Sequence, residues 1–147
     1  MMNKRLEDLY SFRMELDARY EEIKGNEEEA QKIRDEYAEW VERIQVQGEF
    51  FGWVYKMYES MMDRGNDYID VDELTDERKA SGLVKEFREN GVQFFTFSSG
   101  WSSSNEVAWE LVKNGCQICG MVEINSKHKG FMDDKYEKAH GYLFRVF

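Results

Sequence analysis

Apolar residues recur at intervals of three and four positions along the first part of the chain. Between Asn3 and Lys24 they form a single stripe, which predicts an amphipathic helix that ends at Gly25. Asn26 followed by Glu29 has the spacing of a helix N-cap and its partner, so a second helix is predicted to begin there. Because each helix has one apolar stripe, the two are expected to pack as an antiparallel hairpin. The stripes comprise Leu6, Leu9, Phe12, Leu16, Tyr20 and Ile23 in the first helix, and Ala30, Ile33, Tyr37, Trp40, Val41 and Ile44 in the second.

The segment from Glu49 to Met62 is apolar around most of a helical circumference, which predicts the most buried helix of the protein. Gly48 and Gly52 leave two alternatives open: a break before this helix, or a second helix that runs through both glycines. A fourth helix is predicted from about Thr75 to Glu89, with the Asn90-Gly91 pair as its stop signal. The residues expected to face inward there are Leu74, Leu83, Val84 and Phe87.

The period of apolar positions changes to two in the last third of the chain. Val92–Phe97 is rich in β-branched and aromatic residues and predicts a strand. Cys116–Asn125 alternates in polarity and predicts a second strand. A polar, lysine-rich connection then runs to about His140, and Tyr142–Phe147 predicts a third strand.

A short helix is predicted between the first two strands. Ser103 and Glu106 have the spacing of a capping box, and the Asn114-Gly115 pair marks the end of this helix. The predicted fold class is therefore α+β: an N-terminal helical hairpin or bundle followed by a small strand-helix-strand-strand sheet. We expect one domain over residues 1–147, with a helical part at 1–91 and a sheet-bearing part at 92–147.

Charge separates these two parts of the 147-residue chain. The whole sequence has 30 acidic and 20 basic side chains, a formal net charge of -10. Residues 1–91 hold 24 acidic and 14 basic side chains, whereas residues 92–147 hold six of each. All of the excess negative charge is therefore in the helical part. It argues against a protein that coats DNA or RNA, because such proteins neutralise phosphates with clustered Lys and Arg.

The sequence also indicates a location. No signal peptide is recognisable at the start, and no apolar run approaches the roughly 20 residues needed to cross a bilayer. The only two cysteines lie three positions apart, which does not make a disulfide framework. We expect a cytoplasmic protein that does not bind membranes.

The acidic helical surface is the first candidate site. Carboxylates spaced along a helix can imitate the phosphate charge of a nucleic acid and dock on a basic protein or nucleoprotein. A solubilising charged surface is the ordinary alternative, and the basic residues interleaved with these acids weaken the imitation. The candidate partner-binding residues are Glu28, Asp35, Glu39 and Glu42 on the second helix, together with Asp70, Asp72 and Glu73 in the following loop. The basic residues Lys32, Arg34 and Arg43 interrupt this acidic side of the second helix.

The segment 67–74 resembles the second half of a calcium-binding EF-hand loop. The first half does not fit, because the first two ligand positions fall on Met62 and Arg64, and Asp67 replaces the glycine of the sharp turn. An acidic loop that caps the fourth helix is the expected structure instead.

Zinc is an alternative for the C-terminal part. Cys116 and Cys119 have the spacing of a zinc knuckle, and His128 and His140 are the only histidines, so a Cys2His2 site can be written down. In a strand, however, residues three apart point to opposite faces. Strand cysteines that behave as small apolar residues are the expected structure, and no metal or other cofactor is predicted.

The serine-rich loop before the short helix is a candidate anion site. Backbone amides at a helix N-terminus can hold a phosphate, and Ser99, Gly100, Ser102 and Ser103 would permit its close approach. Against this, Glu106 lies in the first turn, and no Lys or Arg occurs between Arg88 and Lys113. The sequence thus leaves a phosphate- or nucleotide-binding domain as an alternative.

Catalysis is not favoured, because no nucleophile and base form a recognisable pair and both histidines lie near the lysine-rich connection. We expect a non-enzymatic protein. Three functions compete: an acidic protein-binding protein, a phosphate- or nucleotide-binding domain, and a structural or regulatory homo-oligomer that buries Trp40 or Trp53 between copies.

A resemblance adds context. The segments FTFSSGWSS, EVAW, NGC, GMVEINSKHKGFM and DDKYEKAHGYLF, between Phe94 and Phe147, resemble a domain of small uncharacterised proteins from prophages and conjugative elements of Firmicutes. Small acidic proteins of mobile elements often block host defence nucleases. The resemblance therefore implies an inhibitor similar to an anti-CRISPR protein, with a host defence nuclease as its partner.

Overall fold

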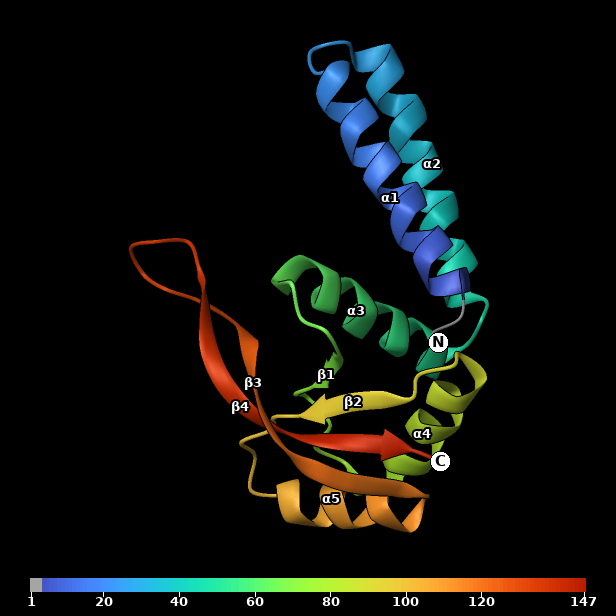
Figure 1. The fold of residues 1–147 in the computed structure, drawn as a ribbon. Coiled ribbons are helices and arrows are strands. Elements are labelled where there is room, and N and C mark those ends of the chain that lie inside the picture. Colours follow the sequence, from blue (N-terminus) through green and yellow to red (C-terminus); the bar gives the residue numbers. More distant parts are fainter. Residues whose placement is uncertain (1–3) are drawn as a thin grey trace.

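The structure is a computed structural model that describes residues 4–147 (Figure 1). Its helices are α1 (Lys4–Glu22), α2 (Glu27–Gln45), α3 (Glu49–Arg64), α4 (Ala80–Glu89) and α5 (Ser104–Lys113), with a 3-10 turn at Glu77–Lys79. Its strands are β1 (Ile69–Val71), β2 (Phe94–Phe97), β3 (Cys116–Lys129) and β4 (Tyr136–Val146). The predicted α+β class is confirmed. No helix within residues 4–147 is long and apolar enough to cross a membrane.

Helices α1 and α2 form the predicted antiparallel hairpin, which extends away from the rest of the chain as an arm (Figure 1). The Asn26 side chain accepts a hydrogen bond from the Glu29 amide at 3.3 Å, which confirms the predicted N-cap. The buried residues of the arm are Leu6, Leu9, Leu16, Ala30, Ile33, Trp40 and Ile44. Two residues of the predicted apolar stripes are not buried: Tyr20 is 37% exposed and Val41 is 42% exposed.

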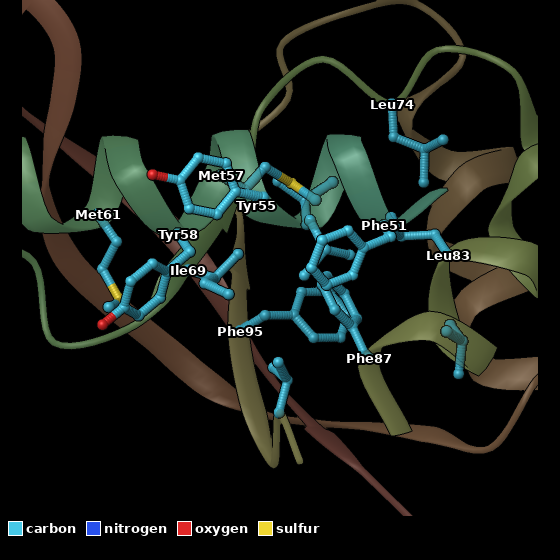
Figure 2. Close-up of a cluster of buried hydrophobic side chains, with 14 of the residues drawn as sticks. Phe51, Tyr55, Met57, Tyr58, Met61, Ile69, Leu74, Leu83, Phe87 and Phe95 are labelled. Atoms are coloured by element: carbon cyan, nitrogen blue, oxygen red, sulfur yellow. The ribbon is translucent and has the colours of Figure 1, made fainter. Parts of the chain in front are cut away.

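Helix α2 ends before Gly48 and α3 is a separate helix, so the second helix does not run through both glycines. Gly48 has a φ of 108°, a backbone conformation that L side chains rarely adopt, whereas Gly52 lies inside α3. As predicted, α3 is the most buried of the described helices, with seven buried side chains. Figure 2 shows α3 residues such as Phe51 and Tyr58 packing toward Ile69, Phe87 and Phe95.

The four strands form one mixed sheet in the order β1-β2-β4-β3. Strand β1 is parallel to β2, and the β2-β4 and β4-β3 pairs are antiparallel. Phe95 lies opposite Phe144 in the β2-β4 register, and their rings stack 5.2 Å apart. Phe87 from α4 packs on the same Phe95 ring at 4.9 Å, so α4 covers this face of the sheet.

Two parts of the sheet were absent from the prediction. Residues 69–71 form a strand rather than part of an acidic loop. Asp70 is accommodated in this strand because its carboxylate accepts hydrogen bonds from Arg64 and Thr96. The residues next to Asp70 in the sequence do not predict these partners. The fourth helix accordingly begins at Ala80, after the 3-10 turn, and not at Thr75.

The lysine-rich connection is also different from the prediction. It is the extension of a long β3-β4 hairpin whose tip contains Phe131 and Met132, exposed by 99% and 87%. Both faces of the hairpin are largely exposed here, so its sequence lacks the alternation that would have identified the strands.

Candidate functional site

The outer half of the α1-α2 arm is held together by its own narrow apolar seam. Leu16, Ala30 and Ile33 are buried between the two helices but do not belong to the main core cluster, whereas Leu6 and Trp40 near the base do. The indole N–H of Trp40 donates to the Leu9 carbonyl at 2.9 Å, which fixes the base of the arm. The arm therefore presents most of its outward surface to solvent.

Four of the seven predicted partner-binding residues lie on one face of this arm. Successive helical residues are about 100° apart, so Glu28, Asp35, Glu39 and Glu42 fall within about 60° of one another around the α2 axis. All four are exposed. Over the 14 positions from Glu28 to Glu42 the helix rises about 21 Å. We call these four residues the α2 stripe.

Within residues 4–147, no cation is ion-paired with the α2 stripe. Asp35 accepts a hydrogen bond from the neutral side chain of Gln31 at 3.0 Å, which leaves its charge uncompensated. The neighbouring acids differ, because Glu27, Glu29 and Glu36 all have basic partners. The stripe thus holds the acids of α2 whose charge no basic partner compensates, whereas the other acids of α2 are ion-paired.

The three cations that interrupt the acidic sequence of α2 are engaged elsewhere. Lys32 bonds Glu29 at 3.1 Å, and Arg34 bonds Glu27. The guanidinium of Arg43 lies 5.6 Å from the centre of the Phe12 ring on α1. These contacts direct the three positive groups to partners outside the α2 stripe.

The remaining predicted partner-binding residues are not part of this surface. Asp70 is 5% exposed, and its carboxylate accepts hydrogen bonds from Thr96 and Ser98, each at 2.7 Å. Arg64, at the end of α3, donates to Asp70 at 3.2 Å and to Asp72 at 3.0 Å. Both acids thus belong to a buried polar network that joins α3, β1 and β2, and they are withdrawn from partner binding.

Burial raises the pKa of Asp70 above its ordinary value, and the hydrogen bonds from Thr96 and Ser98 only partly oppose this shift. The guanidinium of Arg64 is itself buried, and its Nε has no hydrogen-bond partner within residues 4–147. The sequence did not single out Arg64, Thr96 or Ser98, since residues of these types are usually exposed and their pairing depends on a strand that was not predicted.

The polar network continues onto the β3-β4 hairpin. The side-chain amide of Asn66 donates to the Asn125 carbonyl and accepts from the Asn125 amide, both at 2.9 Å. Glu73, the last of the predicted partner-binding acids, pairs with Lys127 at 3.0 Å, and this hydrogen bond raises the pKa of Lys127. The hairpin is therefore tied to the loop on each side of β1.

The serine-rich loop leads from β2 to α5, as predicted, but the capping box is wrong. Ser103 makes no side-chain cap, because its hydroxyl donates to the Thr75 carbonyl at 2.9 Å. A cavity of about 560 Å³ beside the loop is lined by Glu73, Thr75, Trp101, Ser102, Ser103 and Lys127. Its single lining cation is the Lys127 already paired with Glu73. Ser99 and Gly100 do not line the cavity.

The proposed zinc ligands are not brought together. In the β3-β4 register Cys116 lies opposite Val146, while His140 lies opposite Glu123, seven positions further along β3. Residues 4–147 contain no group of three or more His, Cys, Asp and Glu side chains that could hold a metal ion, and this covers the EF-hand-like segment too. Cys116 is buried, which raises its thiol pKa to about 11, whereas Cys119 is exposed.

A larger hollow lies at the elbow where the arm meets the body. It has a volume of about 870 Å³ and lies between α2, α3 and the loop after β1. Its apolar lining includes Trp40, Ile44, Trp53 and Leu74. Trp40 is packed within this chain, so it is not available to bury a face between copies, as the oligomer hypothesis expected.

Comparison with known proteins adds one finding. Residues 53–146 match the model of a family described as a domain of unknown function (DUF7698). The match covers the chain from within α3 to the end of β4, and this chain belongs to that family. No curated protein and no solved structure matches the chain. The α2 stripe lies outside the matched residues.

Proposed function

We propose that this protein is a non-enzymatic binding protein that docks on a basic protein surface through the α2 stripe. The observation that supports this proposal is the set of four exposed carboxylates on one face of a projecting helix, without an ion-paired cation within residues 4–147. Uncompensated charges of one sign steer association with an oppositely charged partner and raise the association rate.

The spacing of the charges favours a partner that normally contacts nucleic acid. Four charges over about 21 Å give one charge per about 7 Å, compared with one per 3.4 Å along the axis for one strand of duplex DNA. The stripe thus has about half the linear charge density of a DNA strand. Such a surface fits a basic channel without reproducing the duplex.

The partner we propose is a host defence nuclease or a nucleoprotein, with this chain as an inhibitor similar to an anti-CRISPR protein. The support for this choice is the resemblance of the C-terminal third to proteins of Firmicutes prophages and conjugative elements, together with the acidic arm. A cytoplasmic location and a viral or mobile-element origin are part of the same proposal.

A comparison of two quadruple variants tests the stripe. The first changes Glu28, Asp35, Glu39 and Glu42 to Gln. The second is a matched control that changes Glu22, Glu89, Glu106 and Glu137 to Gln, so it removes the same charge from other exposed positions. Each protein is used as bait in a host lysate at about 50 mM and about 500 mM NaCl, and is then assayed for inhibition of the purified captured nuclease.

We expect wild type and the control to capture the nuclease at low salt and to slow DNA cleavage. The stripe variant should capture at least about tenfold less nuclease at low salt and inhibit it correspondingly less, because it lacks the charges that steer association. Equal capture by both variants would show that overall acidity, and not the α2 stripe, accounts for binding. Failure of wild type to retain any nuclease at low salt would overturn the proposed function.

A phosphate or nucleotide ligand has less support in the structure. The cavity beside the serine-rich loop contains both Glu73 and its partner Lys127, so it offers an incoming phosphate no free cation within residues 4–147. We therefore retain protein binding as the proposed function.

A further inference from the structure

Strand β3 forms one edge of the sheet, and most of that edge is uncovered. The strand order β1-β2-β4-β3 leaves β3 with one neighbour. Five consecutive residues, Gln117 to Met121, are exposed, although a strand packed on one face normally alternates between buried and exposed positions. An edge strand of this kind presents unpaired backbone N–H and C=O groups to any strand that can lie beside it.

Asn66 shows which backbone groups point outward. Its side-chain amide bonds both the N–H and the C=O of Asn125, as a neighbouring strand would. Both groups of Asn125 therefore point away from β4. Because this direction alternates from residue to residue along an antiparallel strand, the backbone N–H and C=O groups of Glu123 and Met121 point away from β4 as well. The edge is covered at Asn125 and open before it.

The bulge in β3 makes this open edge symmetric. The register shifts between Ile118 and Gly120, so Cys119 is an extra residue on β3. The amide of Phe147 bonds the Gly115 carbonyl, which places residue 115 toward β4. By the same alternation, the backbone N–H and C=O groups of Cys116 and Ile118 point away from β4 on the other side of the bulge. The outward residues at 116, 118, 121 and 123 are symmetric about the midpoint between Cys119 and Gly120.

We propose that the β3 edge pairs antiparallel with the β3 edge of a second copy of this chain. A two-fold axis between Cys119 and Gly120 places Ile118 opposite Met121 of the other copy, and Cys116 opposite its Glu123. Each of these residue pairs exchanges two backbone hydrogen bonds, so all of the outward groups on this stretch are satisfied together. An isologous interface of this kind requires self-complementarity, which an unrelated segment would have no reason to share.

Side-chain character supports a second copy as the occupant. From Cys116 to Ile124 the only charged residue is Glu123, so the edge lacks the lysines that commonly prevent strand addition. Ile118 and Met121 are 45% and 57% exposed, and the pairing brings them together. Two chains of net charge -10 repel one another, and an uncharged stretch is where this repulsion is weakest.

The mass of the full chain in solution tests the proposal. Wild type should sediment with twice the 17.6 kDa mass of one chain within the range of about 1–100 μM. Met121→Lys and, independently, Ile118→Lys should weaken dimerisation by at least about tenfold, because each places a charge beside an apolar partner. Phe131→Lys is the matched control, since it adds the same charge at an exposed apolar residue on the hairpin tip.

Cross-linking gives a second readout that depends on register. In the proposed pairing the two Cys119 side chains lie within about 8 Å of one another, which is within the reach of a short bismaleimide. Wild type and Cys116→Ser should form a cross-linked dimer, and Cys119→Ser and Met121→Lys should not. Circular dichroism establishes that each variant is folded.

Three results would overturn the proposal. A wild type that remains monomeric up to about 100 μM excludes the dimer as an ordinary state. A dimer that is unchanged in folded Met121→Lys and Ile118→Lys variants uses another surface. A dimer without Cys119 cross-linking has a different register. None of these results bears on the α2 stripe, so the proposed function is tested separately.

Discussion

Replacing Asp70 with alanine perturbs the buried network that holds the C-terminal end of α3 against the sheet. The wild-type carboxylate accepts hydrogen bonds from Thr96, Ser98 and Arg64. Alanine removes all three and leaves a buried guanidinium with Asp72 as its remaining acid, at 3.0 Å. Removing one partner of a buried ion pair costs about 3–5 kcal/mol in the free energy of unfolding. Because Asp72 remains and Ser98 is only half-buried, we expect the lower end, about 3 kcal/mol.

The assay is equilibrium unfolding in urea, followed by circular dichroism, with the melting temperature as a second measurement. For a chain of about 150 residues, 1 kcal/mol corresponds to a shift of about 2–4 °C, so Asp70→Ala should melt about 6–12 °C lower than wild type. Asp70→Asn is the control, since it keeps an acceptor oxygen and loses the charge, and it should cost about 1–2 kcal/mol.

The contribution of Asp70 to the free energy of unfolding should depend on pH, and the direction of its pKa shift fixes the sign. Burial raises the pKa of Asp70 in the folded state, so the folded protein binds this proton more tightly than the unfolded chain does. The stabilisation from this proton is fully present below the unfolded pKa of 3.8 and is lost as pH rises through the folded pKa. Acidification through this interval should therefore stabilise wild type relative to Asp70→Asn.

Two results would refute this reasoning. An Asp70→Ala variant that loses less than about 1 kcal/mol would show that the network contributes little or that water enters it. Wild type that loses stability relative to Asp70→Asn on acidification would show that Arg64 favours the ionised carboxylate more strongly than burial disfavours it.

Three further predictions concern single residues. Gly48→Ala should destabilise the protein by about 1–3 kcal/mol in urea unfolding, because a φ of 108° is strained for any residue with a Cβ, and an unchanged midpoint would contradict the break before α3. Iodoacetamide should label Cys119 quickly in the folded protein and Cys116 only after unfolding, which fragment-ion mass spectrometry can measure on the one tryptic peptide, residues 114–127, that holds both cysteines. Asn66→Ala should speed amide hydrogen exchange at Asn125, because it removes the acceptor of that N–H, and exchange as slow as in wild type would mean that another group protects it.

The helical arm could be predicted closely because its information is local. The spacing of Leu6, Leu9 and Leu16, the Asn26 cap and the stop at Gly25 all act within a few residues of one another. The exposed face of α2 follows from the same periodicity, so the α2 stripe could be located before the structure was known. What the sequence did not provide is the pairing of Lys32, Arg34 and Arg43 away from it.

Strand β1 could not be predicted for the opposite reason. Its three residues include Asp70, which is acceptable in a buried strand only because Arg64, Thr96 and Ser98 provide its hydrogen bonds. Two of these partners lie 26 and 28 positions away in the sequence. An acidic loop was the simpler interpretation of these residues, and it placed Asp70 and Asp72 on a surface where they do not lie.

The open edge of β3 shows why a correct strand prediction does not reveal an interaction surface. The sequence placed Cys116, Ile118, Val122 and Ile124 on one side of a strand, and this alternation is interrupted by the bulge at Cys119. The bulge changes which backbone groups point outward, and the contacts of Asn66 and Gly115 identify them. Charge separates the two proposed surfaces, with the uncompensated carboxylates on α2 and a nearly uncharged β3 edge. A dimer formed through β3 would therefore keep both acidic arms available, and the two surfaces could act in the same assembly without competing.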